Sequence, residues 1–392
     1  MTRYLHLDKR ELERRNCLWT AREISQQPRI WRTMHARIDA CREDLDSWLR
    51  PTLAKPNPRI LLCGAGTSAF IGDTAAAWFR AHCQVSATCH IASVSTTDLT
   101  VDPLQFLRQD LPTLMISFAR SGDSPESIAC VELADQLLSD CRHVIITCNP
   151  DGRLARLAES HENVLCLVMP EETNDRGFAM TSSYTAMLVS CVAIFTPDRM
   201  QLEQVAELTE RLLDGRAADA ADARVMAQRD FRRLVVLGAG CLSGTAAEAA
   251  LKCLELTAGQ VVAVHDTPLG FRHGPKIIID DSTVVVHMRS GDAHRRRYDR
   301  DLMRELRTEN RSAAIVELSP ATMGAQIGSA SAARCLDDVW LSLVYVVYGQ
   351  LLAFHKAMAL GVAADSPCPT GEVNRVVNGV TIYPFTNATE SE

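Results

Sequence analysis

Two segments of this sequence repeat each other at a nearly constant spacing, and this repeat limits the possible folds more than any other feature. The apolar run and glycine turn at residues 59–66 (RILLCGAG) recur 174 residues later at residues 233–240 (RLVVLGAG). A second pattern at residues 120–123 (RSGD) recurs 169 residues later at residues 289–292. Two patterns in the same order at nearly equal offsets predict two copies of one structural unit.

Each copy alternates short apolar segments with helical patterns, which predicts an α/β fold with parallel sheets and crossover helices. The strand candidates of the first copy are residues 60–63, 89–94, 113–117, 143–147 and 164–169. We expect an N-terminal helical segment, a first α/β domain, a helical linker, a second α/β domain and a C-terminal tail. Their predicted bounds are residues 1–52, 53–200, 201–228, 229–372 and 373–392.

The N-terminal segment carries two signals for the start of a helix. Residues 20–23 (Thr-Ala-Arg-Glu) have the pattern of a capping box, and Pro28 suits the first turn of a second helix. We expect a helical lead-in without a core of its own.

The composition excludes several classes of protein. Of 392 residues, 47% are hydrophobic and 23% charged, which is typical of a soluble globular chain. The net charge of -7 gives no basic field for nucleic acid or for a membrane surface. The N-terminus has no apolar signal core, and no uninterrupted apolar run is long enough to span a bilayer. The 14 cysteines form no C-x-x-C pairs, which predicts reduced thiols in the cytoplasm and no metal site.

Two polar loops each follow a strand candidate and precede a predicted helix, at residues 64–68 (Gly-Ala-Gly-Thr-Ser) and 120–125 (Arg-Ser-Gly-Asp-Ser-Pro). Such turns direct backbone N–H groups and the positive end of a helix toward an anion. Several hydroxyls, one arginine and no Walker lysine suit a phosphomonoester better than a nucleoside triphosphate. The alternatives are tight turns without a ligand, with Ser124 acting only as a helix N-cap.

A charged stripe follows the second glycine turn. Glu248, Lys252 and Glu255 are spaced so that all three lie on one face of a helix whose other positions are mostly Ala, Leu and Cys. A helix this apolar is mostly buried, so the stripe is expected to line a site. The alternative is an exposed ladder of ion pairs.

Together with residues 273–275 (His-Gly-Pro), these segments resemble the sugar isomerase (SIS) domain, and two copies are similar to the isomerase half of glucosamine-6-phosphate synthase. Residues 64–72, 172–182, 270–275 and 373–380 resemble the bacterial tagatose-6-phosphate ketose/aldose isomerase family, also described as galactosamine-6-phosphate deaminase/isomerase. The resemblance implies two tandem SIS domains, each a flavodoxin-like parallel sheet flanked by helices. It also implies a site between the halves and a homodimer.

The resemblance implies a role for each candidate residue. Glu255 would move a proton between C2 and C1, with Lys252 beside it and Glu248 holding Lys252 in place. His273 would open the sugar ring; without the resemblance it is more simply a loop histidine that caps a neighbouring carbonyl. The residues that would bind the substrate and its 6-phosphate are Gly66, Thr67, Ser68, Arg120, Ser121, Gly122, Ser124, Thr181 and Arg375.

One departure concerns the C-terminal tail. The synthase relatives carry a lysine there that enters the site, whereas this chain has no lysine from Gly361 onward and places Asn378 at that position. Arg375 is the nearest cation. It either neutralises developing charge or pairs with Glu372.

The activity that the resemblance implies is conversion of galactosamine 6-phosphate to tagatose 6-phosphate and ammonia, without a metal or another cofactor. One rival is an aldose–ketose isomerase that releases no ammonia. Another is a non-catalytic sugar-phosphate sensor, which the acidic charge and the lack of an evident helix-turn-helix disfavour. A dinucleotide enzyme is disfavoured because Ala69 takes the last glycine position of that fingerprint.

Overall fold

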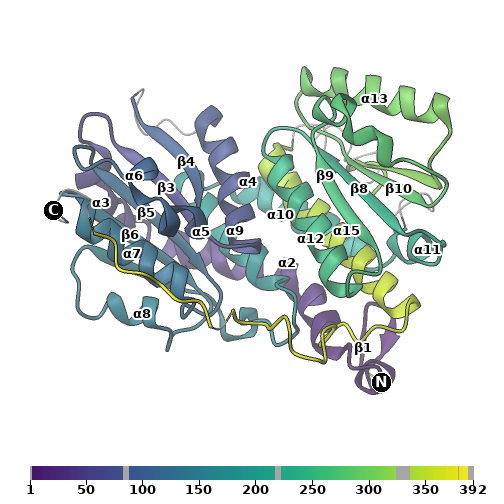
Figure 1. Ribbon diagram of the computed structural model, residues 1–392, viewed down its shortest axis with the longest axis horizontal. Coiled ribbons are helices and arrows are strands. Elements are labelled where there is room, and N and C mark those ends of the chain that lie inside the picture. Colours follow the sequence, from purple (N-terminus) through teal and green to yellow (C-terminus); the bar gives the residue numbers. More distant parts are fainter. Residues whose placement is uncertain (1, 83–87, 217–221, 324–335, 378, 387–392) are drawn as a thin grey trace.

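The computed structural model describes residues 2–82, 88–216, 222–323, 336–377 and 379–386. Each half of the chain contributes one parallel sheet (Figure 1). The first sheet has the strand order β4-β3-β5-β6-β7, and the second has the order β11-β10-β8-β9. The first four strands of the two halves therefore follow the same order, and the predicted repeat is a repeat of the sheet.

The first sheet consists of β3 (Arg59–Gly64), β4 (His90–Ser95), β5 (Thr113–Ala119), β6 (Cys141–Thr147) and β7 (Val164–Val168). All five predicted strands are confirmed, with bounds within two residues. The second sheet consists of β8 (Arg233–Gly238), β9 (Val262–Asp266), β10 (Thr283–Met288) and β11 (Ala314–Leu318).

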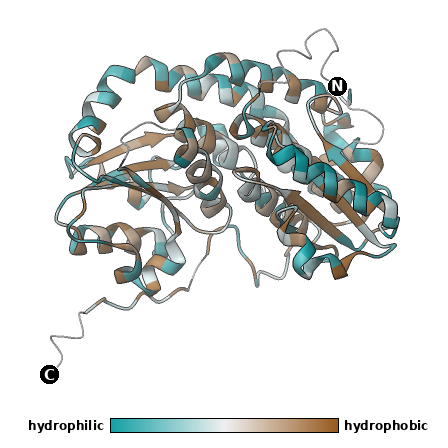
Figure 2. Ribbon diagram, turned by 90° about the horizontal axis from the view of Figure 1, so that it is seen from above, coloured by the Kyte–Doolittle hydropathy of each residue, from teal (hydrophilic) through white to brown (hydrophobic). Residues whose placement is uncertain are grey.

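Helices cover both faces of the first sheet because alternate residues of its strands are apolar on opposite sides. The helices are α4 (Thr67–His82), α5 (Thr96–Val101), α6 (Pro103–Phe106), α7 (Pro125–Leu137), α8 (Arg153–Leu157) and α9 (Ser182–Phe195). Ile60 and Leu62 face the core that contains α4 and α9, whereas Leu61 and Cys63 face α5 and α7. Figure 2 shows the apolar strands enclosed between helices with polar outer faces.

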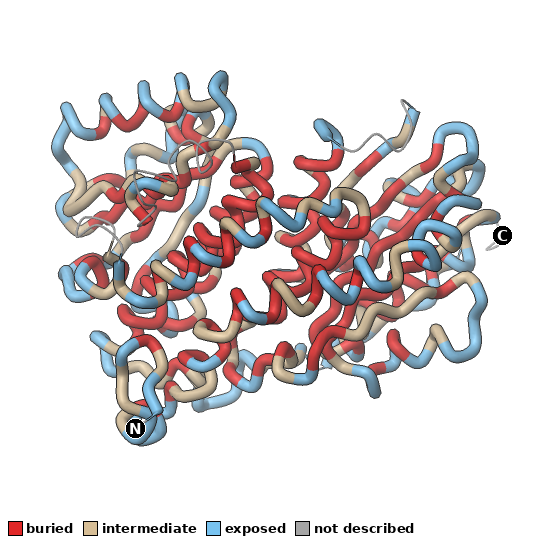
Figure 3. The backbone as a smooth tube through the Cα atoms, turned by 180° about the vertical axis from the view of Figure 1, so that it is seen from behind, coloured by how far each residue is buried: buried red, intermediate tan, exposed pale blue. Residues whose placement is uncertain are grey.

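The second sheet is covered by α12 (Leu242–Leu256) and α15 (Asp338–Ala359) on one face and by α13 (Arg295–Glu309) on the other. Helix α12 packs against α15 and also against α4 of the first half. The two halves therefore share one core, which appears as the band of buried helices in Figure 3.

Helix α15 is the one helix in the described part of the chain that is long and apolar enough to cross a membrane. Every residue of its most apolar window is buried inside the protein, so it is a central core helix.

The N-terminal segment is more than a lead-in. Its helices α1 (Lys9–Arg14), α2 (Leu18–Ala40) and α3 (Arg42–Leu53) follow an unexpected hairpin of β1 (Arg3–Tyr4) and β2 (Leu7–Asp8). Helix α2 packs against α9 and α10 (Arg199–Leu213), and its buried residues belong to the shared core.

Both predicted helix starts in this segment are wrong, because α2 runs through them without interruption. Thr20 and Glu23 lie inside α2, and Pro28 lies in its middle. Proline has no N–H to bond the carbonyl four residues earlier. The side-chain amide of Gln27 donates to that carbonyl, Ile24 O, at 3.1 Å and so satisfies it.

The predicted linker contains most of α10, followed by α11 (Ala223–Ala227). Helix α10 packs against α2 and α15, so it is part of the core. The C-terminal tail returns from the second half along α7 of the first half (Figure 1). There Gln136 Nε2 donates to Phe385 O at 3.4 Å.

The first turn of α2 is capped by a residue from the other end of the chain. The Asp365 carboxylate accepts from Trp19 N at 2.9 Å, from Thr20 N at 2.8 Å and from Thr20 Oγ1 at 2.8 Å. We predict that Asp365→Ala lowers the free energy of unfolding by about 1–2 kcal/mol, because these donors lose their acceptor. Denaturant titration would measure the change. Glu372→Ala, at an exposed position, is the control, and an equal loss in both variants would contradict the capping role.

Candidate active site

The two predicted anion loops meet at one edge of the first sheet. Strands β3 and β5 are parallel neighbours with Cys63 opposite Ser117, so their carboxyl ends lie side by side. Helix α4 begins at Thr67 directly after the first loop, and α7 begins at Pro125 after the second. Both helix N-termini therefore start at this edge, where backbone N–H groups and the helix dipoles favour an anion.

Glycine is required at specific points of these loops. At Gly64, a Cβ atom would lie 2.4 Å from the backbone carbon of Ser68, so a side chain there would collide with α4. Gly122 has φ +69°, a left-handed conformation that glycine adopts without strain. The loops can therefore lie close to a ligand through their backbone.

The serines of the loops have distinct environments. Ser68 is buried, and Ser121 is half-buried. Ser124 is the N-cap residue of α7, but its hydroxyl does not cap the helix; it donates to Ser127 Oγ at 2.6 Å. Pro125 takes the first helical position, where its missing N–H costs no hydrogen bond.

Helix α12 brings the charged stripe to this edge. Lys252 is fully buried, and its Nζ donates to Thr67 Oγ1 of the first loop at 2.9 Å. The same Nζ lies 2.5 Å from Glu255 Oε2 and 3.4 Å from Glu248 Oε1. The burial predicted from the sequence is confirmed, and the exposed ladder is excluded. Glu255, with a side chain 25% exposed, is the accessible carboxylate of the three.

The electrostatics of this triad follow from its burial. Burial raises the pKa of Glu248 to about 8, against the opposing effect of Lys252, and Glu255 raises it further. Burial alone would lower the pKa of Lys252, but the two carboxylates outweigh it and raise the pKa. At neutral pH the triad is therefore a cation paired with Glu255, with Glu248 largely protonated.

Arg120 is 7% exposed, and its guanidinium contacts two segments, the loop that contains Phe178 and the C-terminal tail. Its Nη1 donates to Phe178 O at 3.3 Å, and its Nη2 donates to the carbonyl oxygen of Arg375. Burial lowers the pKa of Arg120, and the nearby Arg375 acts in the same direction. A guanidinium has five N–H donors, so these bonds leave others for an anion.

Arg375 does not pair with Glu372, so that alternative is wrong. Its Nε donates to Asp175 O at 2.6 Å, and its Nη2 donates to Asn174 Oδ1 at 2.8 Å. Glu372 instead accepts from Thr370. The tail thus binds the loop before α9, whereas Asn378 lies outside the described residues.

Two acids that the sequence analysis missed hold this loop in place. The fully buried Asp175 accepts from Thr181 N at 2.7 Å and from Ser183 N at 2.9 Å, and so caps α9. Glu23 of α2 accepts from Arg176 N at 2.6 Å and from Gly177 N at 3.2 Å. Burial raises the pKa of Glu23 to about 8, and Asp175 adds to the increase.

Thr181 is fully buried at the N-terminus of α9. Its backbone N–H binds Asp175, and its hydroxyl has no hydrogen-bond partner among the described residues. The structure therefore puts Thr181 at the start of α9, directly after the loop that Arg120 and Arg375 contact, with a buried hydroxyl.

His273 does not join the other candidates within one chain. It ends η3 (Gly270–His273), whose Phe271 packs on Val235 and Leu237 beside α13. Helix α12 covers the opposite face of that sheet, so the sheet separates His273 from Glu255. His273 is exposed and makes no hydrogen bond to a described residue, so it does not cap a neighbouring carbonyl either.

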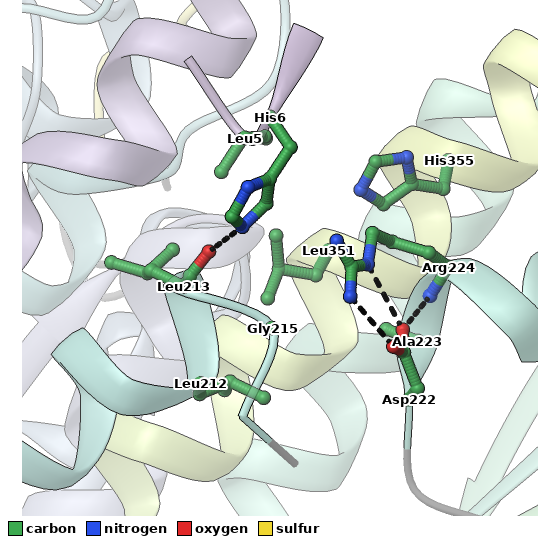
Figure 4. Close-up of a pocket in the computed structure, with 10 residues that line it drawn as sticks. All are labelled: Leu5, His6, Leu212, Leu213, Gly215, Asp222, Ala223, Arg224, Leu351 and His355. Carbon is green, nitrogen blue, oxygen red and sulfur yellow. Dashed lines mark hydrogen bonds and ion pairs between the residues drawn. The ribbon is translucent and has the colours of Figure 1, made fainter. Parts of the chain in front are cut away.

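A small cavity at the N-terminal hairpin is not part of this site (Figure 4). Its volume of about 10 Å³ holds roughly one water molecule. Most of its polar groups already have partners, because His6 donates to Leu213 O at 2.9 Å and Arg224 pairs with Asp222 at 2.8 Å, whereas His355 Nε2 has no partner among the described residues. Burial lowers the pKa of His355 to about 4, so this histidine is neutral at pH 7.

A parallel sheet in flavodoxin order with serine-rich loops at its carboxyl edge is the architecture of a sugar isomerase domain. The family model for the SIS domain matches residues 52–197. The chain is 46% identical over 381 residues to the D-galactosamine-6-phosphate deaminase AgaS of Shewanella sp. (strain ANA-3). This match covers 97% of this chain and 96% of that protein. It is 42% identical over 375 residues to the protein of the same name from Escherichia coli, covering 94% and 96%. The chain belongs to this AgaS family of SIS-domain proteins, and the predicted resemblance is confirmed.

Solved structures agree with this assignment. A tagatose-6-phosphate ketose/aldose isomerase from Escherichia coli superposes with a TM-score of 0.83 at 40% identity, covering 94% of this chain and 97% of that one. A glucosamine-6-phosphate deaminase from Thermotoga maritima superposes with a TM-score of 0.65 at 18% identity, covering 92% and 99%, and so shares the fold.

The raised pKa of Glu248 predicts a specific pH dependence of stability. The folded protein keeps a proton on Glu248 that the unfolded chain releases, so this group makes stability fall as pH rises from about 4.5 to about 8. We predict that Glu248→Gln lacks this contribution to the loss of stability with rising pH. As the pH rises from 5 to 8, the free energy of unfolding of the variant should rise by on the order of 1–4 kcal/mol relative to that of the wild type.

Denaturant titrations across that pH range would measure the effect. Glu162→Gln, on the exposed surface, should reproduce the wild-type curve. Parallel curves for Glu248→Gln and the wild type would contradict the prediction. Glu23 contributes in the same direction, so some pH dependence remains in the variant.

Proposed function

We propose that this chain is a galactosamine-6-phosphate deaminase/isomerase that converts galactosamine 6-phosphate to tagatose 6-phosphate and ammonia. The observation that carries the proposal is the contact of Lys252 with Thr67 and Glu255. It brings an accessible carboxylate next to the helix N-termini and hydroxyls of an anion site. A phosphate bound at the loops would therefore hold the carbon chain of a sugar beside a base.

The proposed chemistry uses the open-chain aldehyde of the amino sugar. Glu255 takes the proton from C2, which gives an enolamine, and returns a proton to C1, which gives a 2-imino sugar. Water adds to C2, the C–N bond breaks, and ammonia leaves with the ketose as the other product. Lys252 compensates the charge of the Glu255 carboxylate before it takes the C2 proton and after it returns a proton to C1, and the protonated Glu248 lies beside Lys252.

The phosphate would be held by Ser68, Ser121 and Ser124, by the backbone of Gly66, Thr67 and Gly122, and by Arg120. Arg375 and Thr181 would act through the loop at residues 174–178, because both donate a hydrogen bond to Asp175 of that loop. The relatives named D-galactosamine-6-phosphate deaminase support this substrate.

We further propose that His273 acts in the site of a second copy of the chain, as a homodimer allows. The sheet between His273 and Glu255 supports this arrangement, because one chain alone leaves the histidine outside its own site. Exposed apolar side chains also flank both groups: Leu269 and Ile277 near the histidine, and Leu254 beside Glu255. A partner surface that covers them would bury apolar area.

The activity is tested by measuring ammonia release from galactosamine 6-phosphate and glucosamine 6-phosphate side by side. We expect release from the galacto epimer, and a loss of at least about 100-fold in Glu255→Gln because the general base is absent. Release mainly from the gluco epimer would overturn the substrate and keep the mechanism. Ketose formation without ammonia would replace the proposal with a plain isomerase.

The shared site is tested by mixing two inactive variants, Glu255→Gln and His273→Ala. In a mixed dimer, one of the two sites combines an intact Glu255 from one chain with an intact His273 from the other. After unfolding and refolding together, we expect about a quarter of wild-type activity, since half of the dimers are mixed and each has one working site. Activity no higher than that of the separate variants would show that each site uses its own histidine.

A further inference from the structure

The second copy of the serine-glycine loop shares one hydrogen bond with the first, although Gly122 is left-handed with φ +69° and Gly291 is not. Residues 289–292 follow β10 as residues 120–123 follow β5. In the first loop Asp123 N donates to Ser121 Oγ at 3.3 Å, and in the second Asp292 N donates to Ser290 Oγ at 3.0 Å. The second half therefore keeps a serine and a glycine N–H at the position where the first half would bind an anion.

In the second half this position already contains a carboxylate. Asp338, the first residue of α15, is only 3% exposed. It accepts from Ser290 Oγ at 2.6 Å, from the backbone N–H of Gly291, and from Arg295 Nη1 at 2.9 Å. A hydroxyl, a backbone N–H and a guanidinium are the donors that proteins use for phosphate.

The second glycine turn belongs to the same cluster. A Cβ atom on Gly240 would lie 3.1 Å from Arg295 Cζ, so the guanidinium lies against this turn. The serine loop and the arginine therefore contact Asp338 directly, and the glycine turn packs against the arginine. Burial raises the pKa of Asp338, and the bonds from Ser290, Gly291 and Arg295 oppose that increase.

The first half lacks this arrangement. Its corresponding helix, α9, begins with Ser182 instead of an acid, and Asp175 caps that helix from the preceding loop. Among the described residues, no carboxylate accepts from Ser121 Oγ or from the N–H of Gly122. The anion loop of the first half is thus free of an internal acceptor.

We propose that the second half contains a phosphate-type anion site that Asp338 of the same chain fills, so that only the first half is open to a phosphorylated ligand. Asp338 supplies the negative charge that a phosphate would bring. It also ties the start of the central helix α15 to the carboxyl edge of the second sheet. Removing this carboxylate should create a site for inorganic phosphate.

The test is equilibrium dialysis of full-length protein with radiolabelled inorganic phosphate. We expect Asp338→Ala to bind about one more phosphate per chain than the wild type, because the vacated donors accept it. The double variant Asp338→Ala/Ser290→Ala should lose this additional phosphate. Asp337→Ala, which removes the neighbouring carboxylate that binds Gln201, is the matched control and should keep the wild-type number.

An equal number of bound phosphates in Asp338→Ala and the wild type would overturn the proposal. The additional phosphate bound by the variant does not depend on the proposed function. If the proposed function were wrong, the wild type would bind no phosphate. If the alanine variant does not fold, thermal unfolding of Asp338→Ser, whose smaller side chain also vacates the site, decides when measured with and without phosphate. Phosphate should stabilise that variant more than the wild type, and equal stabilisation of both would reject the internal anion.

Discussion

The assembly of this protein depends on one buried cation. Lys252 comes from the second half of the chain, yet it donates to Thr67 of the first half and lies between Glu248 and Glu255. Removing an ammonium group from water costs several kcal/mol unless its partners are in place. Those partners are complete only when α12 docks against α4. Docking of the two halves therefore supplies the Thr67 hydroxyl that completes the partners of Lys252, and it brings the proposed base to the loops of the first half.

Both ends of the chain contribute to the same site, although neither contains the proposed base. Glu23 of the N-terminal helix α2 binds the loop at residues 176–177, while Arg375 of the tail binds the same loop at residues 174–175. Asp365 in turn fastens the start of α2. This loop carries Phe178, whose carbonyl positions Arg120. Segments distant in sequence thus act as supports for the groups that would contact the substrate, as preorganised sites require.

The two halves show how one unit can serve two purposes. Both have the same order of four strands and the same hydrogen bond from the aspartate N–H to the serine hydroxyl in the serine-glycine loop. In the first half no carboxylate of the described residues accepts from the serine hydroxyl or the glycine N–H of the loop, and in the second half Asp338 accepts from both. In the second half, donors of the kind that bind phosphate instead bind Asp338 and so position the start of the central helix α15. In the proposed function, the loop of the first half would hold the phosphate near Glu255.

The sequence alone determined the features that depend on local pattern. The repeat, the five strands of the first sheet, both anion loops and the buried face of α12 follow from periodicity and turn residues, which act over a few positions. The tertiary structure decided whatever depends on contacts between distant segments. Thr20, Glu23 and Pro28 look like helix starts, but packing against α9 and the Gln27 side chain keep α2 continuous. Asp175 and Asp338 gave no local signal, since their partners come from other elements. His273 and Glu255 both belong to predicted motifs, but only the fold shows that a sheet separates them within one chain, because the face on which a segment packs is set by the whole core.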